Sequence, residues 1–222
     1  MRKDSNDNKI SYNFLILGDK MVGKTSILER YVNNSFNPNY ITTIGMDKRI
    51  KRIEVNNYDI TIYVTDTAGQ ERFRSLSKSF YKQADAILIG FSLTDKTSLN
   101  SISYWFEEIN NNIGNQASLG LVLFGNKCDD KINVQVNQED ITPIINKFNL
   151  TYFETSAKNN IHIQELFEYL IKTTIIKKGH LKRIGLDEKS TFDDIHINIK
   201  ENQRLEVKKK KVSKKKKKKK FC

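Results

Sequence analysis

A glycine-rich segment near the start of the chain, GDKMVGKTS from Gly18 to Ser26, has the residue types and spacing to hold a phosphate. Its glycines stand in a G-x4-G-K-T pattern and let backbone N–H groups turn inward. Lys24 can reach the terminal phosphates of a nucleotide, and Thr25 offers a hydroxyl to Mg²⁺. The segment predicts a nucleotide site and leaves the base open.

Three later polar segments select guanine as the base. In Asp66–Gln70 (DTAGQ), the carboxylate would lie near Mg²⁺ and the glycine amide near a γ-phosphate. In Asn126–Asp129 (NKCD), the carboxylate can accept from the ring N–H and the exocyclic amine of guanine, a pair that adenine lacks. Thr155–Lys158 (TSAK) is the third segment. Together they predict a guanine nucleotide site.

Short apolar segments must position these motifs. The continuous apolar runs at Phe14–Leu17, Ala86–Phe91 and Leu121–Phe124 are typical of strands buried on both faces. Ile50–Val55 and Tyr58–Thr65, joined by two asparagines, predict a hairpin. Each polar motif follows a predicted strand, so we expect the motifs to meet at the edge where a doubly wound sheet binds its ligand.

Helices are predicted between the strands. Apolar residues recur at helical spacing within residues 102–113, 141–148 and 163–170, and residues 26–32 follow the glycine-rich segment as its helix. Alternation of strands and helices predicts an α/β domain with a mainly parallel sheet covered on both sides. No internal repeat is apparent in the sequence.

The four motifs in this order resemble those of small Ras-like GTPases. The runs TDTAGQERFRSL and WFEEI are most similar to the Rab branch, and the resemblance covers roughly residues 10–178. It implies a Ras-like P-loop GTPase domain with a six-stranded, mostly parallel sheet and helices on both faces. It also implies a GTP/GDP switch that hydrolyses GTP with Mg²⁺ and changes the order of two switch segments.

The resemblance assigns roles residue by residue. Gln70 would orient the attacking water, with Lys24 and Thr43 completing the catalytic set. Thr25, Thr43 and, through water, Asp66 would hold Mg²⁺. The expected nucleotide contacts are Asp19, Lys20, Met21, Val22, Gly23, Lys24, Thr25, Ser26, Phe36, Tyr40, Thr43, Gly69, Asn126, Lys127, Asp129, Ser156, Ala157 and Lys158.

Some of these residues also fit plainer interpretations. Taken singly, Phe36 suits a core position better than a place against the guanine, and only its family position reverses that. Cys128 is expected to be a buried, small apolar residue. The three histidines share no metal-ligand spacing, so no metal role is assigned to them.

Lys20 and Met21 depart from the family, whose members usually carry small residues there. A long side chain at Lys20 should project toward the γ-phosphate and toward the space that an activating protein's arginine would enter. Three consequences are open. Lys20 blocks that arginine and slows hydrolysis; its ammonium acts in cis on the developing charge; or it is a solvated lysine with little effect.

The surface that meets protein partners departs as well. By resemblance, exchange factors, activating proteins and effectors contact residues 36–48 and 66–83 of a monomeric switch domain. Relatives tend to place an aromatic triad between the switches, and the matching residues here are Lys48, Thr65 and Phe80. Loss of two aromatic rings removes hydrophobic hot-spot contacts, so a distinct set of effectors is expected.

The net charge of +12 lies in the C-terminal end of the chain. Eleven lysines occupy Lys208–Lys220, which leaves the rest nearly neutral. The predicted organisation is a flexible N-terminus (1–9), the GTPase domain (10–178) and a low-complexity lysine-rich tail (179–222). Two cysteines, no signal-peptide pattern and no membrane-length apolar run predict a chain that works inside the cell.

The tail resembles a polybasic, prenylated terminus, which would bind the cytosolic face of an anionic membrane through Lys208–Lys220 and a lipid on Cys222. Cys222 is the last residue, however, so it forms no C-a-a-X box, and the cysteine pair usual in Rab proteins is missing. The alternatives are a lysine run that merely reflects a low-complexity, Asn- and Lys-rich chain, and a nuclear or nucleic-acid-binding patch.

Three classes of function follow. The first is a Rab-like GTPase that hydrolyses GTP and directs vesicle traffic, which Gln70 favours. The second is a mainly GTP-bound effector platform that hardly turns over, which Lys20 favours. The third is a nuclear or polyanion-associated GTPase, for which the missing cysteine pair leaves room.

Overall fold

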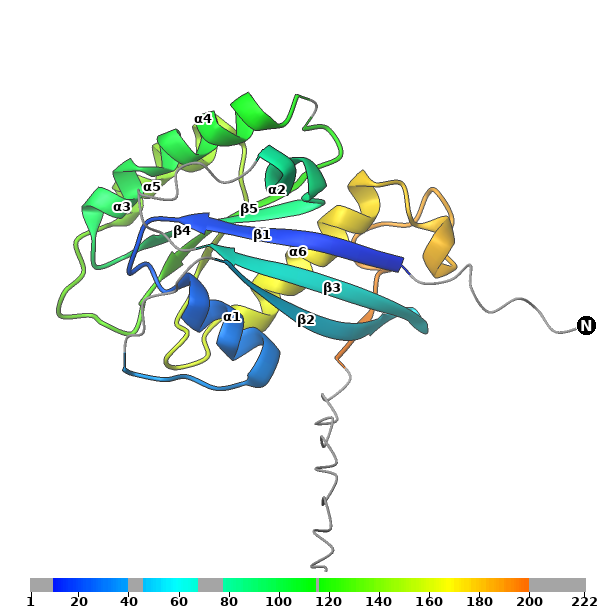
Figure 1. Ribbon diagram of the computed structural model, residues 1–222, viewed down its shortest axis with the longest axis horizontal. Coiled ribbons are helices and arrows are strands. Elements are labelled where there is room, and N and C mark those ends of the chain that lie inside the picture. The colour runs from blue at the N-terminus through cyan, green and yellow to red at the C-terminus, as the bar shows by residue number, and fades with distance from the viewer. Residues whose placement is uncertain (1–9, 40–45, 68–77, 115, 200–222) are drawn as a thin grey trace, which may run out of the picture.

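The computed structural model describes residues 10–39, 46–67, 78–114 and 116–199 (Figure 1). The predictions for Tyr40, Thr43, Gly69, Gln70 and the segment from Lys208 to Cys222 therefore lie outside the described residues. None of the helices in the described ranges combines the length and the apolar character that a membrane span needs.

The described part of the chain builds a seven-stranded sheet in the order β6-β5-β4-β1-β3-β2-β7. β2 is antiparallel to β3 and β7 is antiparallel to β2, while the remaining neighbours are parallel. The strands are β1 (Ile10–Gly18), β2 (Met46–Val55), β3 (Tyr58–Thr67), β4 (Ala86–Ser92), β5 (Gly120–Asn126), β6 (Tyr152–Glu154) and β7 (Ile197–Asn198). The predicted α/β class is confirmed, and the expected six strands become seven because of β7.

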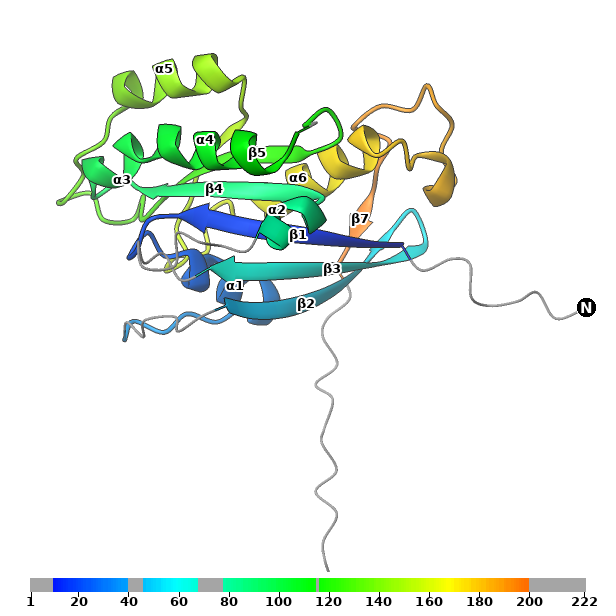
Figure 2. The same ribbon diagram turned by 45° about the horizontal axis from the view of Figure 1, so that its top comes forward.

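Helices cover both faces of the sheet, as Figures 1 and 2 show. They are α1 (Lys24–Asn33), α2 (Lys78–Gln83), α3 (Lys96–Asn100), α4 (Ile102–Asn112), α5 (Gln138–Phe148) and α6 (Ile163–Lys177). α1 and α6 share one apolar core with β1 and β3, while α4 and α5 share the other core with β4 and β5. Stacked rings join each helix pair: the ring centroids are 3.7 Å apart for Tyr31 and Phe167, and 3.9 Å apart for Phe106 and Phe148.

The strand pattern follows from burial. β4 is buried at every residue, which explains its continuous apolar sequence. Along β3 the side chains alternate between buried and partly exposed, as the alternation in its sequence predicts, because helices cover only one face there. β1, β3 and β5 all end at one edge of the sheet, and the polar motifs start at these ends.

Ordered structure continues past the boundary expected near Gly179. We call residues 179–199 the C-terminal strap; it contains the 3₁₀ turn η2 (Lys182–Ile184) and β7. Ile184 and Ile195 are buried against the core, and β7 pairs with the far end of β2, beside which the strap is drawn in Figure 2. The strap escaped the sequence analysis because its few buried isoleucines stand among many charged residues.

Polar contacts fix the strap at two further points. The Tyr12 hydroxyl of β1 lies 2.9 Å from His180 Nδ1, and burial lowers the pKa of His180. At the hairpin tip, Asn56 Nδ2 donates to the Asp194 carbonyl at 3.2 Å, and the His196 N–H donates to Asn56 Oδ1 at 2.8 Å. The strap therefore joins the end of α6 to the tip of the β2–β3 hairpin.

Truncation should expose this dependence. A chain that stops after Lys178 loses the buried Ile184 and Ile195. Its free energy of unfolding should fall by about 2–4 kcal/mol, because the entropy cost of ordering the strap offsets part of what burial of these side chains contributes. A chain that stops after Ile199 keeps the strap and serves as the control. Urea unfolding of both checks this expectation, and equal stability would show that the strap contributes nothing.

Candidate nucleotide-binding site

A cavity of about 720 Å³ opens at the carboxyl edge of the sheet, within the range of small-ligand pockets. The predicted residues that line it come from the glycine-rich segment, the segment after α1 and two loops that follow β5 and β6. They are Lys20, Met21, Gly23, Lys24, Thr25, Ser26, Phe36, Asn126, Lys127, Asp129, Ala157 and Lys158. Segments far apart in the sequence thus share one cavity.

The phosphate loop, Gly18–Ser26, leads from β1 into α1. Gly23 caps α1 in the left-handed region with φ +96°, and a Cβ there would lie 2.3 Å from Asn126 Nδ2. Glycine is thus required both by conformation and by space. The loop presents the amino end of α1 to the cavity, and that end favours an anion.

Lys24 is a buried cation at the floor of this loop. Its side chain is 5% exposed, and Nζ donates to the Gly18 carbonyl at 2.9 Å and to the Asp19 carbonyl at 2.8 Å. Burial lowers the pKa of Lys24 to about 8, against the opposing charges of Asp66 and Asp19. A phosphate beside Nζ would favour the charged form.

Thr25 and Asp66 supply hard oxygen atoms of the kind that Mg²⁺ prefers. Thr25 Oγ1 donates to Asp66 Oδ2 at 2.5 Å, which brings the hydroxyl at the start of α1 to the buried carboxylate near the end of β3. A magnesium ion in a nucleotide site takes one or two protein ligands and completes its shell with phosphates and water. The donor set therefore fits Mg²⁺.

The two unusual residues of the loop lie at the cavity. Met21 has φ +63° and is 56% exposed, and Lys20 is exposed beside it. A side chain in this left-handed region costs about 1 kcal/mol relative to glycine. Both side chains line the cavity and are exposed, so neither is packed into the core.

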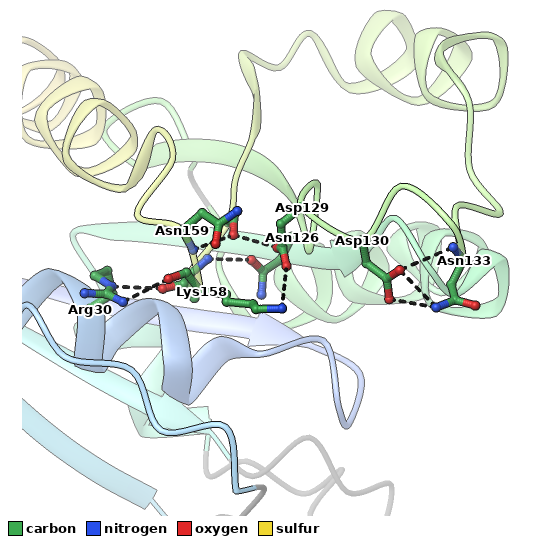
Figure 3. A network of polar contacts seen from close by, with 9 residues as sticks. Arg30, Asn126, Asp129, Asp130, Asn133, Lys158 and Asn159 are labelled. Carbon is green, nitrogen blue, oxygen red and sulfur yellow. Dashed lines mark hydrogen bonds and ion pairs between the residues drawn. The ribbon is translucent and has the colours of Figure 1, made fainter.

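Asn126 connects the phosphate loop to the predicted base pocket. Its Nδ2 donates to the Val22 carbonyl at 2.9 Å. Its Oδ1 accepts from the Ala157 N–H at 3.2 Å, a contact drawn in Figure 3. Val22 and Ser156 are fully buried; Val22 contributes its backbone carbonyl and Ser156 its hydroxyl, which donates to Asp129. One amide side chain at the end of β5 therefore holds three segments of the site together.

The Asp129 carboxylate faces the cavity with one oxygen already oriented. Ser156 Oγ donates to Asp129 Oδ1 at 2.6 Å, and Lys158 Nζ lies 3.9 Å from Asp129 Oδ2 (Figure 3). Ser156 Oγ also accepts the Asn159 N–H at 2.9 Å, which fixes the hydroxyl. A carboxylate fixed in this way can accept two parallel hydrogen bonds, as guanine offers.

Arg30 is a positioning residue that the sequence analysis missed. From α1 its Nε donates to the Ala157 carbonyl at 2.9 Å, and its Nη2 donates to the Lys158 carbonyl at 3.1 Å (Figure 3). Its Nη1 donates to the Asn34 carbonyl, at the start of the segment that contains Phe36. No spacing signal could have found this role, because the two carbonyls that Arg30 holds beside the predicted base pocket are 127 and 128 residues away.

Phe36 and Asp19 stand apart from the other predicted contacts. Phe36 lines the cavity and is partly buried against the core, while its place against the guanine stays a prediction. The Asp19 side chain turns away and accepts from the Trp105 Nε1 of α4 at 2.9 Å. Cys128 is buried, as expected, and burial raises the pKa of its thiol.

Comparison with known proteins places the chain in a family. The sequence matches the family model for the Ras family over residues 13–176. It is 34% identical to the Ras-related protein Rab-13 of Rattus norvegicus over 191 residues, which cover 86% of this chain and 93% of that protein. It is 39% identical to the Ras-related protein SEC4 of Candida albicans (strain WO-1) over 168 residues, covering 76% and 78% of the two chains. The chain therefore belongs to the Ras family, as a Rab-like small GTPase.

Proposed function

We propose that GTP and GDP lie across the cavity described above, with the base against Asp129 and the phosphates against the phosphate loop. The observation that carries the proposal is the geometry of Asp129 and Lys24. A carboxylate oriented by Ser156 and a buried ammonium stand at one cavity, and Asn126 links the segments that carry them. As a Rab-like GTPase, the chain regulates vesicle traffic by alternating between the two nucleotide states.

Each residue then has a role in hydrolysis. Lys24 binds the terminal phosphates, while Gln70 orients the attacking water. Thr25 and Thr43 would hold Mg²⁺ directly, and Asp66 would hold it through water. When bound, Mg²⁺ neutralises charge on the β- and γ-phosphates. The Thr25–Asp66 hydrogen bond supports the metal part of this proposal.

We further propose that Lys20 keeps the protein GTP-bound for longer than its relatives. Lys20 is exposed at the rim of the cavity, and the neighbouring Met21 holds the loop in a left-handed turn. An activating protein supplies an arginine that raises the rate of GTP hydrolysis by about 10³–10⁵-fold. The Lys20 ammonium would occupy the space that this arginine enters and would repel its positive charge. The switch is then slow to turn off and serves as an effector platform.

Replacing Lys20 with glycine should restore stimulated turnover. In single-turnover GTP hydrolysis by the full chain, we expect an activating protein to accelerate the Lys20→Gly variant by at least about 10²-fold and the wild type hardly at all. Lys189→Gly, an exposed lysine on the strap, is the matched control. Equal stimulation of both proteins would mean that Lys20 is solvated, and faster unstimulated hydrolysis by wild type would mean that it acts in cis.

Effectors are expected to meet an unusual surface. The exposed Lys48 of β2 lies opposite Thr65 of β3, with its Nζ 4.4 Å from the centre of the Tyr63 ring. Where relatives place rings, this surface offers a cation held over a ring. Partners of this chain should therefore present acidic or polar groups at that point.

We propose that the lysine-rich tail holds the GTPase on the cytosolic face of an intracellular membrane. Each lysine near an anionic leaflet contributes about 1 kcal/mol at best, and one lipid chain alone anchors only marginally. Lys208–Lys220 and a lipid on Cys222 would therefore act together.

A reporter fused to about the last 20 residues tests the tail. We expect a membrane signal that falls strongly when Cys222 is replaced with serine, because the lysines and the lipid act together. Replacing alternate lysines with glutamine while keeping Cys222 should weaken the signal in part. A nuclear signal that does not depend on Cys222 would instead support the polyanion-associated GTPase.

A further inference from the structure

The phosphate loop carries a carboxylate, Asp19, in a segment built to hold anions. Its backbone carbonyl faces inward and accepts from Lys24 Nζ at 2.8 Å. A carboxylate free to turn the same way would lie close to the nucleotide phosphates and would compete with them for that ammonium. Like charges a few ångströms apart repel strongly where water is scarce, so this side chain needs a partner elsewhere.

Trp105 is that partner. Its Nε1 donates to Asp19 Oδ1 at 2.9 Å, across 86 residues of sequence. An indole N–H is only a donor, and a hydrogen bond to a charged acceptor is stronger than a neutral one. The contact directs the Asp19 side chain toward α4 and away from the cavity, whose lining does not include Asp19.

The indole is itself held in place. Trp105 packs against the core that α4 and α5 share with β4 and β5, and its ring meets Tyr104 edge-on with the centroids 5.3 Å apart. Neighbouring Phe106 is buried in the same core, so the helix cannot shift easily. A rigid helix therefore supplies a fixed donor to a loop that must keep one geometry.

We propose that Trp105 positions the phosphate loop by holding the Asp19 carboxylate away from the nucleotide phosphates, and thereby lengthens the lifetime of bound nucleotide. This rests on the proposed placement of the phosphates against the loop. Without the donor, the carboxylate turns toward Lys24 and the phosphates. Bound GDP then leaves faster, while packing of the ring contributes mainly to stability.

A double-mutant cycle on the full chain separates these effects. Trp105→Phe keeps most of the apolar ring and removes the N–H, and Asp19→Asn removes the charge. We measure dissociation of a fluorescent GDP from wild type, both single variants and the double variant, with thermal unfolding of each. Trp105→Phe should raise the dissociation rate about tenfold, and it should have little effect in the background of Asp19→Asn.

The outcomes are distinct. An equal increase in both backgrounds, or no increase, would overturn the proposal and leave Trp105 a packing residue. Failure of the wild type to bind fluorescent GDP would instead contradict the proposed nucleotide site.

A second measurement covers the case in which Trp105→Phe does not fold. Trp105 is the only tryptophan, so its indole N–H gives one amide-region NMR signal that can be followed directly. In the GDP-bound wild type, this proton should exchange with water at least about tenfold more slowly than in Asp19→Ala. Equal exchange would show that the hydrogen bond does not persist in the nucleotide complex, and the proposal would fail.

Discussion

Replacing Asp129 with asparagine should turn a guanine site into a xanthine site. The carboxylate accepts from two guanine donors, whereas the amide of asparagine accepts from one group and donates to another. Xanthine presents a ring N–H next to a carbonyl, which matches that amide. GTP affinity should fall by about 10²–10⁴, and affinity for the xanthine nucleotide should rise above it. Ser156 can still donate to the asparagine oxygen, so the loop should keep its shape.

Competition binding with GDP and xanthosine diphosphate measures the change. Asp130→Asn is the matched control, because the Asp130 carboxylate bonds to Asn133 and belongs to the same loop (Figure 3). The control should keep its preference for guanine. If Asp129→Asn bound GDP as tightly as wild type, the base would lie elsewhere.

Replacing Lys24 with methionine should abolish tight nucleotide binding. Methionine keeps much of the length and apolar stem of lysine and removes the ammonium, which is buried and bonded to the Gly18 and Asp19 carbonyls. A buried phosphate then loses its charge-assisted partner, so affinity for GTP and GDP should fall by at least about 10²-fold. Thermal unfolding of the variant checks that the fold survives the loss of these two hydrogen bonds.

Lys20→Met provides the control for this prediction. It makes the same change of side chain earlier in the loop, at an exposed position. Binding of fluorescent GDP, followed by titration, should fall far less in Lys20→Met than in Lys24→Met, because Lys20 lines the cavity but is exposed to water. Equal losses in the two variants would mean that net charge of the loop, rather than the placed ammonium of Lys24, determines affinity.

The sequence was informative where burial leaves a regular pattern. The continuous apolar runs at β4 and β5 and the alternation along β3 predicted strands, since each reflects whether one or both faces are covered. Motifs after those strands then had to share an edge of the sheet. The short helix α3 was missed because five residues show no period, and only the Asp95 side chain marks its start.

Contacts across long separations could not be predicted. Arg30 and Trp105 act on partners in other elements, and neither has a local signature that differs from an ordinary helix residue. The strap was assigned to the tail for a related reason. Ile184 and Ile195 of the strap are buried only because they pack against a core built by other elements, and the local sequence does not show that core.

The central claim is that this chain is a guanine-specific switch that hydrolyses GTP with Mg²⁺. Single-turnover phosphate release tests it most directly. The full chain is incubated with GTP or with ATP, and the reaction is started by adding Mg²⁺, with EDTA added instead as the metal-free control. We expect slow release of phosphate from GTP with Mg²⁺, a sharp drop with EDTA, and no stable complex with ATP. Equal binding and turnover of ATP and GTP would contradict the account, because Asp129 could then not select the base.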